Sequence, residues 1–413
     1  MSGHDLGDMV FPGSFGAALE GLRLHYVKQT VRLFLRAGAT LEARERPAHQ
    51  RLAALVSKAL AAAPAPLLNC FFVPTVGAPI HCYANRERWP ELGAAIGAAF
   101  QNAQAHLLLE MAIRDLIPAG ESFDWDCGAP RLLSPSIGAS LSPSADATGW
   151  RFTANGVSVL GGQGDGSFLR LSAQSLTRGR KAVQGLRTEL IYVPLPGDVR
   201  LALADINPIA ETETHPAKSG SVLNLGEHSE DDWRSSLQVA LEWINAATPE
   251  LFAEMRILLQ EIVPVGYDAE RHYSASYQEA VGMIYMTLHP NPLVMAEALI
   301  HEFQHNKLYL ASYWDPVLNN AFHPLYGSPV RPDPRPLWGV LLALHAFLPV
   351  AAFYRRLRKA GHSVSRTPEF ERRLAQIDEQ NAEAFATLEK HGSWTPAGKR
   401  LWSGLGALKV ADA

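Results

Sequence analysis

The spacing of apolar residues changes twice along the chain. From residue 15 to about 120, apolar side chains recur every three or four positions, as in Leu52–Ala63 and Leu92–Ile117, which predicts helices. From about 130 to 235, Gly, Ser, Thr and Pro become frequent and separate short β-prone runs, which predicts strands. The helical spacing then returns and continues through Leu237–Ile262.

This pattern predicts an α+β fold that is mostly helical, with a central β-rich region and a C-terminal helical part. Three regions are expected: a helical region at 1–130, a β-rich region at 131–235 and a second helical region at 236–413. The expected strands are Trp150–Thr153, Val157–Leu160, Glu189–Val193 and Val199–Leu203.

One uncharged run is just long enough to cross a membrane. It extends from Pro336 to Tyr354 and contains a histidine and an internal proline, His345 and Pro349. Polar and helix-breaking residues are unfavourable in a lone membrane span, so we expect a buried core helix and no membrane partner.

Composition and charge narrow the possible functions. The chain has 413 residues, and its 37 Lys and Arg against 41 Asp and Glu give a net charge of -4, which argues against a broadly basic nucleic-acid binder. Its three cysteines form no CxxC pair, so neither a disulfide framework nor a thiolate zinc site is expected. Residues Met1–Leu24 lack a signal-peptide pattern, and a cytoplasmic location is expected.

The strongest chemical signal is an HExxH motif, His301-Glu302-Phe303-Gln304-His305. A spacing of four residues places two imidazoles on one helix face, one turn apart, where both can bind one divalent metal ion. Asn291-Pro292 is a good helix start, and no further Gly or Pro interrupts the sequence up to Leu310. His301 and His305 are therefore the expected metal ligands.

A catalytic metal site needs a third protein ligand. The metzincin pattern fails, because Leu308 and Ala311 stand where it requires Gly and His. A thermolysin-like glutamate is also missing, since no Glu occurs between Phe303 and Pro368. His345 is the preferred candidate, because a polar side chain in an apolar helix needs a partner, and a backbone carbonyl is the alternative partner to a metal. His323, in a loop-like stretch, is the second candidate.

Imidazole ligands suit iron and zinc alike, so the ligand type does not select the metal. Three histidines, or two and a carboxylate, leave positions on Fe(II) for an oxo-acid and O₂. The rigid segment Val330–Pro336 carries Arg331 and Arg335, which are suited to bind the distal carboxylate of 2-oxoglutarate. The alternative is a structural Arg–Asp bridge with Asp333.

Just before the motif, Ala280–Leu288 has the composition of a strand. An edge strand beside a metal can bind an extended peptide through main-chain hydrogen bonds. An ordinary interior strand is the alternative.

These residues resemble the HExxH-motif peptide-modification proteins of bacterial gene clusters for ribosomally made, post-translationally modified peptides. The resemblance lies in Glu297–Leu308, Val330–Leu337, the run from His345 to Phe347 and Leu201–Pro208. It covers most of the C-terminal half of the chain and little of the first 130 residues. Where many members have Tyr-Ala-His, this chain has His345-Ala346-Phe347.

The resemblance implies β-hydroxylation of a side chain in a precursor peptide, dependent on Fe(II) and 2-oxoglutarate. His301 and His305 would bind the iron, Arg331 or Arg335 would bind the oxo-acid, and Glu302 would orient substrate or a ligand. The alternative function is a zinc metallopeptidase that trims a leader peptide, with Glu302 as the general base.

Overall fold

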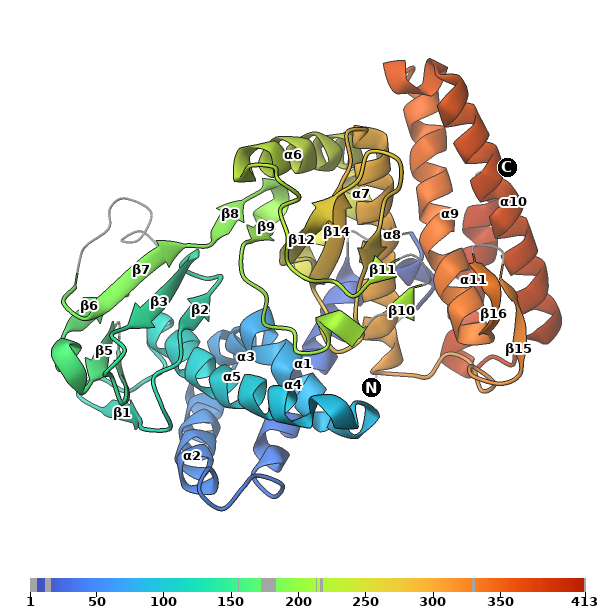
Figure 1. Cartoon of the computed structure of the whole chain (residues 1–413). Helices are drawn as coiled ribbons and strands as arrows, with labels where there is room; N and C mark the ends of the chain where they lie inside the picture. Colours follow the sequence, from blue (N-terminus) through green and yellow to red (C-terminus); the bar gives the residue numbers. More distant parts are fainter. Residues whose placement is uncertain are drawn as a thin grey trace. The chain divides into compact units, whose positions relative to one another are not determined.

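The structure is a computed structural model that describes residues 6–11, 16–154, 156–171, 183–212, 214–215, 218–328 and 331–411 (Figure 1). Helices account for 56% and strands for 16%, the strands lying in several small sheets. The α+β fold expected from the sequence is confirmed.

The chain divides into two compact units. Unit 1 comprises Met1–Tyr26, Pro194–Leu201 and Asn224–Ala413, and unit 2 comprises Val27–Val193 and Ala202–Leu223. Most of the predicted N-terminal helical region and most of the predicted β-rich region therefore belong to the same unit.

Unit 2 combines a group of helices with small antiparallel sheets. Its helices are most of α1 (Ala17–Ala37), α2 (Arg46–Ala62), α3 (Pro64–Phe72), α4 (Pro74–Ala84) and α5 (Gly93–Ile113), with short 3₁₀ helices η2 (Arg86–Arg88), η3 (Pro90–Leu92), η4 (Gly162–Gly164) and η6 (Ala210–Thr212). One sheet has the strand order β1-β4-β5-β6 and another the order β2-β3-β7. Helix α5 packs against β2, β4 and β5.

The predicted β-rich region does form strands. The strands are β2 (Leu132–Ser134), β3 (Ala139–Pro143), β4 (Gly149–Thr153), β5 (Gly156–Leu160), β6 (Phe168–Arg170), β7 (Leu186–Leu190), β8 (Tyr192–Pro194), β9 (Arg200–Ala202), β10 (Thr214–His215) and β11 (Lys218–Ser219). Strand β1 (Ser122–Trp125) lies earlier, in the region that was expected to be helical. All four strand runs expected from the sequence lie in or overlap these strands.

Unit 1 contains the sheet that precedes the motif helix. The sheet has the order β13-β14-β12-β9-β8, and the chain passes between the units within β8 and β9. Strand β12 (Glu261–Tyr267) is parallel to β14 (Met283–Leu288) and to β9, while β13 (Ser274–Ala275) is antiparallel to β14 at the edge. A second, two-stranded sheet pairs β15 (Leu325–Ser328) with β16 (Arg331–Pro336).

Helices make up most of the rest of unit 1. They are α6 (Glu230–Ala247), α7 (Pro249–Leu258), α8 (Pro292–Ser312), α9 (Leu337–Lys359), α10 (Pro368–His391) and α11 (Pro396–Ala411), with 3₁₀ helices η1 (Leu6–Met9), η5 (Pro196–Asp198) and η7 (Ser363–Arg366). Helix α9 lies between α8 and α10 and packs against both (Figure 1).

The prediction of one continuous helix over Leu237–Ile262 is wrong in two places. The chain breaks at Thr248, between α6 and α7, because Pro249 disfavours helical geometry in the residue before it and has no N–H to donate. The second helix ends at Leu258, and Ile262 lies in β12.

Strand β14 is an interior strand, since β12 and β13 pair with its two sides. The strand expected over Ala280–Leu288 is confirmed from Met283 onward, and its interior position agrees with the second of the two interpretations. The edge position beside the motif helix belongs to β13, which contacts α8.

Helix α9 is the uncharged run of the sequence. By length and composition α9 is apolar enough to cross a membrane, and the bent pair of α3 and α4 passes the same test if it is counted as one span. In α9, 83% of the most apolar window is buried within the protein, as is typical of a core helix.

A short segment near the N-terminus is part of the core of unit 1. Leu6, Met9 and Val10 are buried, and η1 packs against α8 and α11. The approach to α11 is close, because a Cβ on Gly404 would lie 2.4 Å from the carbonyl oxygen of Gly7. A glycine is therefore required at this point of α11.

A buried ion pair connects α8 to α7. The Lys307 Nζ donates to the Glu254 carboxylate at 2.5 Å, and the two side chains are 0% and 1% exposed. Loss of solvation is expensive for both groups, so each depends on the other to remain charged.

We predict that Lys307→Met destabilises the protein by about 3–5 kcal/mol, because the Glu254 carboxylate is left buried without its cation. Unfolding in urea, followed by circular dichroism, measures the effect. The double variant Lys307→Met/Glu254→Leu should recover much of the loss. A double variant that is less stable than the single variant would contradict this view of the pair.

Candidate metal centre

Helix α8 brings together the three residues of the motif that carry chemistry. It starts where the sequence predicts, with the Asn291 side chain accepting a hydrogen bond from the Leu293 N–H. The ligand atoms of His301, Glu302 and His305 all lie within 4.8 Å of one another. Donor atoms bound to one metal ion lie at most roughly 4 Å apart, so small side-chain movements bring this group to a binding geometry.

The two imidazole rings lie close together on one face of the helix. Their centroids are 4.4 Å apart and the ring planes are inclined by 73°. Both side chains are partly exposed, whereas Glu302 between them is buried, at 3% exposure. The shared helix face expected from the four-residue spacing is therefore present.

Helix α8 is buried along most of its length, so its polar side chains need partners inside the protein. The Asn306 side chain accepts a hydrogen bond from the Gly282 N–H and donates one to the Met283 carbonyl at the start of β14. The Gln304 side chain donates to the Val10 carbonyl. Lys307 has Glu254 as its partner. These contacts hold the helix in one orientation about its own axis.

Among the described residues of α8, the exceptions to this pattern are the side-chain oxygen of Gln304 and one ring nitrogen of each motif histidine. The Nδ1 atoms of His301 and His305 are buried and make no hydrogen bond with any residue that the structure describes. A buried polar atom is costly without a partner, and a metal ion is a natural partner for an imidazole nitrogen.

Both rings are in the form that binds metal. Loss of solvation lowers the pKa of His301 to about 4, with a further contribution from His305, and it lowers the pKa of His305 to about 4. Near neutral pH both imidazoles are therefore uncharged and available as ligands.

Two serines hold the Glu302 carboxylate. The Ser274 hydroxyl donates to one carboxylate oxygen and the Ser276 hydroxyl to the other, both at 2.7 Å. Ser274 lies in the edge strand β13, and Ser276 follows that strand directly. We call these two residues and Glu302 the serine clamp.

His345, the preferred third ligand, does not belong to this group. Its side chain is fully buried in α9, and its Nε2 is bonded to the Met9 carbonyl at 2.9 Å. Loss of solvation lowers its pKa to about 3, so the ring is a neutral core histidine. The backbone-carbonyl alternative to a metal ligand is thus what the structure contains.

Phe347 is the residue of α9 that faces the motif. Its ring meets the His301 ring edge to face, with centroids 4.6 Å apart. A side chain at this position therefore approaches His301 from the neighbouring helix, where it could add a ligand to the His301–Glu302–His305 group. Phenylalanine has no atom that binds a metal ion.

The other predicted site residues lie in the β15–β16 hairpin and the loop before it. Arg335 forms an ion pair with Asp333 at 2.9 Å, which is the structural bridge that the sequence allowed. The Arg331 side chain lies outside the described residues, and the exposed His323 is not part of the His301–Glu302–His305 group.

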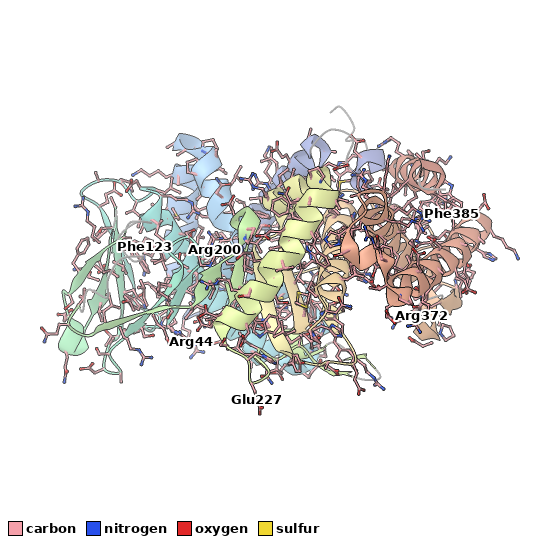
Figure 2. All side chains as sticks on the ribbon, turned by 90° about the horizontal axis from the view of Figure 1, so that it is seen from above. Arg44, Phe123, Arg200, Glu227, Arg372 and Phe385 are labelled. Atoms are coloured by element: carbon pink, nitrogen blue, oxygen red, sulfur yellow. The ribbon has the colours of Figure 1, made fainter. Side chains whose placement is uncertain are left out.

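Glu297, one turn before His301, is occupied by another contact. Its carboxylate receives the guanidinium of Arg373 from α10 and the Tyr354 hydroxyl at 2.8 Å. Arg372, the preceding residue of α10, instead projects to the outside of the protein (Figure 2). The Glu297 network ties α8, α9 and α10 together beside the imidazoles.

Sequence reasoning missed Ser274, Ser276 and Phe347 as parts of the site. The two serines alternate with Ala275 just before the predicted strand, and residues two apart in a strand face the same side. That spacing was a usable signal, but the carboxylate they hold is more than 25 residues away in sequence.

No model of a known protein family matches the chain, and a comparison with curated proteins finds no match. The candidate centre therefore has to be argued from its own geometry. His301, His305 and Glu302 are a donor set of two imidazoles and a carboxylate, which divalent iron and zinc both accept.

We predict that His345→Gln reduces the pH dependence of stability. The pKa of His345 is about 3 in the folded protein and about 6.5 unfolded, so this histidine contributes stability above pH 6.5 that is lost as the pH falls. The variant should lower the slope of unfolding free energy against pH by about 1.4 kcal/mol per pH unit near pH 5. Denaturant unfolding at several pH values measures it. The exposed His323→Gln variant should match the wild type, and an unchanged slope in His345→Gln would contradict the burial argument.

We also predict that Phe347→His strengthens metal binding, because it supplies an imidazole beside His301. The dissociation constant for Zn²⁺ should fall roughly tenfold or more, the scale on which even outer-shell partners act. Competition with a chromophoric chelator measures it. Phe353→His on the same helix is the control, and equal affinities for the two variants would show that position 347 does not face the metal.

Proposed function

We propose that the chain is a non-haem iron(II) oxygenase that uses 2-oxoglutarate to hydroxylate a side-chain β-carbon of a ribosomally made precursor peptide. The observation that carries the proposal is the grouping of His301, Glu302 and His305 within 4.8 Å. Two histidines and one carboxylate are the ligand set of many iron(II) oxygenases, and they leave coordination positions for the oxo-acid and O₂.

The state of Glu302 favours this function over hydrolysis. In a zinc peptidase of the HExxH type, the glutamate must accept a proton from water. Here each carboxylate oxygen already accepts a hydrogen bond from a serine hydroxyl, which fixes the carboxylate in place. A carboxylate fixed beside two imidazoles is suited to join them in binding a metal ion.

The chain's own residues would bind and orient, while the iron and its oxo-acid, when bound, supply the oxidising chemistry. Arg335 would reach the oxo-acid only by leaving Asp333, and Arg331 is the other candidate from the sequence. The substrate class rests on the family resemblance. We further propose that the enzyme is cytoplasmic and acts without nucleic-acid or membrane partners.

The test uses the purified full chain with Fe(II), 2-oxoglutarate and O₂. We expect succinate to form slowly without peptide, and faster with a precursor peptide encoded near the gene, which should gain one oxygen atom. His301→Ala and His305→Ala should abolish both products, measured by mass spectrometry, while the exposed variant His323→Ala should retain them.

Two outcomes would contradict the proposal. Zinc-dependent cleavage of the peptide that requires Glu302 would identify the peptidase alternative. Succinate formation at the wild-type rate in His301→Ala would show that the motif is not the catalytic centre.

A further inference from the structure

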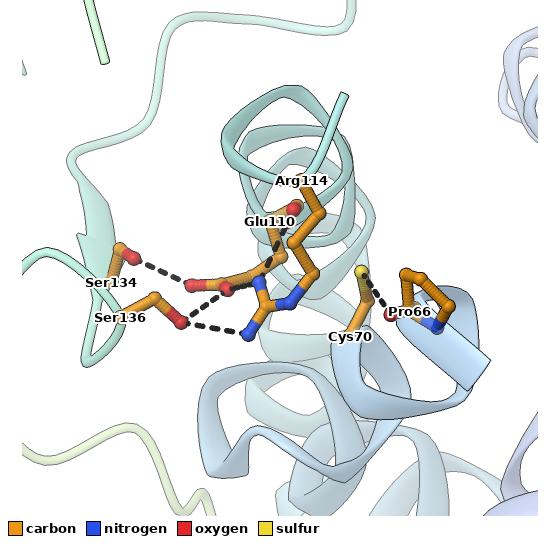
Figure 3. Close-up of polar contacts among 6 residues, drawn as sticks. All are labelled: Pro66, Cys70, Glu110, Arg114, Ser134 and Ser136. Atoms are coloured by element: carbon orange, nitrogen blue, oxygen red, sulfur yellow. Dashed lines mark hydrogen bonds and ion pairs between the residues drawn. The ribbon is translucent and has the colours of Figure 1, made fainter. Parts of the chain in front are cut away.

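Among the described residues, a second glutamate is held by two serines in the same way as in the serine clamp, and it lies in the other unit. In unit 2, Glu110 of α5 is fully buried, and its two carboxylate oxygens accept hydrogen bonds from Ser134 at 2.5 Å and Ser136 at 2.6 Å (Figure 3). As with Ser274 and Ser276, the first serine ends or occupies a short strand and the second lies two residues later.

The recurrence has a physical reason. In each pair the serines are only two residues apart, one in a short strand and the other just after it, so both hydroxyls can reach one carboxylate. An ionised carboxylate only accepts hydrogen bonds and has about four acceptor positions. One hydroxyl on each oxygen fixes the plane of the carboxylate, and with it the direction from which a cation meets the group.

At Glu110 the positive partner of the carboxylate is Arg114. The Arg114 guanidinium, one helical turn after Glu110, forms an ion pair with the carboxylate and also donates to Ser136 at 3.0 Å (Figure 3). The two serines therefore hold a buried anion in the position where a positive charge meets it.

At Glu302 the nearby groups that can bind a metal ion are the imidazoles of His301 and His305. The Glu302 carboxylate lies within 4.8 Å of ligand nitrogens of His301 and His305. Imidazole nitrogens and a carboxylate are the donors that divalent metal ions bind, and one such ion can be the partner of all three.

We infer that Ser274 and Ser276 are positioning residues that hold the Glu302 carboxylate toward a metal ion shared with His301 and His305. This inference rests on the metal centre proposed above. It adds that metal affinity depends on two hydroxyls, one in strand β13 and one just after it, neither of which belongs to the HExxH motif.

The test compares Zn²⁺ affinity in the full chain by competition with a chromophoric chelator. Zn²⁺ is chosen because it does not change oxidation state. We expect Ser274→Ala/Ser276→Ala to bind Zn²⁺ roughly 10–100-fold more weakly, the usual effect of losing outer-shell partners. Each single variant should show part of the loss, and Ser276→Thr, which keeps a hydroxyl, should restore affinity to the wild-type level.

The other clamp provides a matched control. Ser134→Ala/Ser136→Ala removes the same two bonds from Glu110 and should lower the melting temperature of the metal-free protein, yet leave Zn²⁺ affinity unchanged. This comparison separates an effect on the metal from a general loss of stability. If the Ser274/Ser276 double variant does not fold, the single variants and Ser276→Thr provide the same comparison.

The outcomes are distinguishable. A wild-type chain that binds no Zn²⁺ would overturn the metal centre and the inference with it. If the wild-type chain binds Zn²⁺ and both Ser274→Ala and Ser276→Ala bind it as tightly as the wild type, the inference alone would be overturned. An equal loss of affinity in the two double variants would show that the serines act only through overall stability.

Discussion

The structure of unit 1 depends on the burial of polar side chains along α8. A polar group removed from water needs a partner within the protein, and α8 carries several such groups among its apolar residues. Their partners come from segments that are far apart in sequence, including η1, α7, α10 and the sheet. Helix α8 thereby organises much of the unit around itself.

This constraint also distinguishes the two histidines from the other polar residues of α8. Their neighbours on the helix are held by hydrogen bonds or ion pairs to the protein, whereas His301 and His305 lie partly exposed with buried nitrogens that no described residue satisfies. The helix is thus held in place by contacts that leave these two rings free to bind. Such separation between a fixed support and a free pair of donors is what a binding site requires.

The parts of the site that were predictable are those set by local geometry. The four-residue spacing of the histidines determines their shared face once the segment is helical, and Asn291-Pro292 marks the helix start. The third-ligand prediction depended on a non-local partner. His345 is buried as expected, but the Met9 carbonyl that accepts its hydrogen bond is 336 residues away in sequence, and no spacing rule reveals such a pairing.

For the fold, the break at Thr248 was predictable from Pro249. The division into units was not, because the grouping of the N-terminal helices with the central strands depends on tertiary contacts.

The buried segment at Leu6–Val10 has a consequence for the order in which the chain folds during synthesis. Its Val10 and Met9 carbonyls accept hydrogen bonds from the side chains of Gln304 and His345, which the ribosome adds about 300 residues later. Unit 2 can form while translation continues, since almost all of its chain lies between these partners. The first-made residues of unit 1 must wait, and the ligand helix reaches its final surroundings only after both distant parts of the polypeptide have left the ribosome.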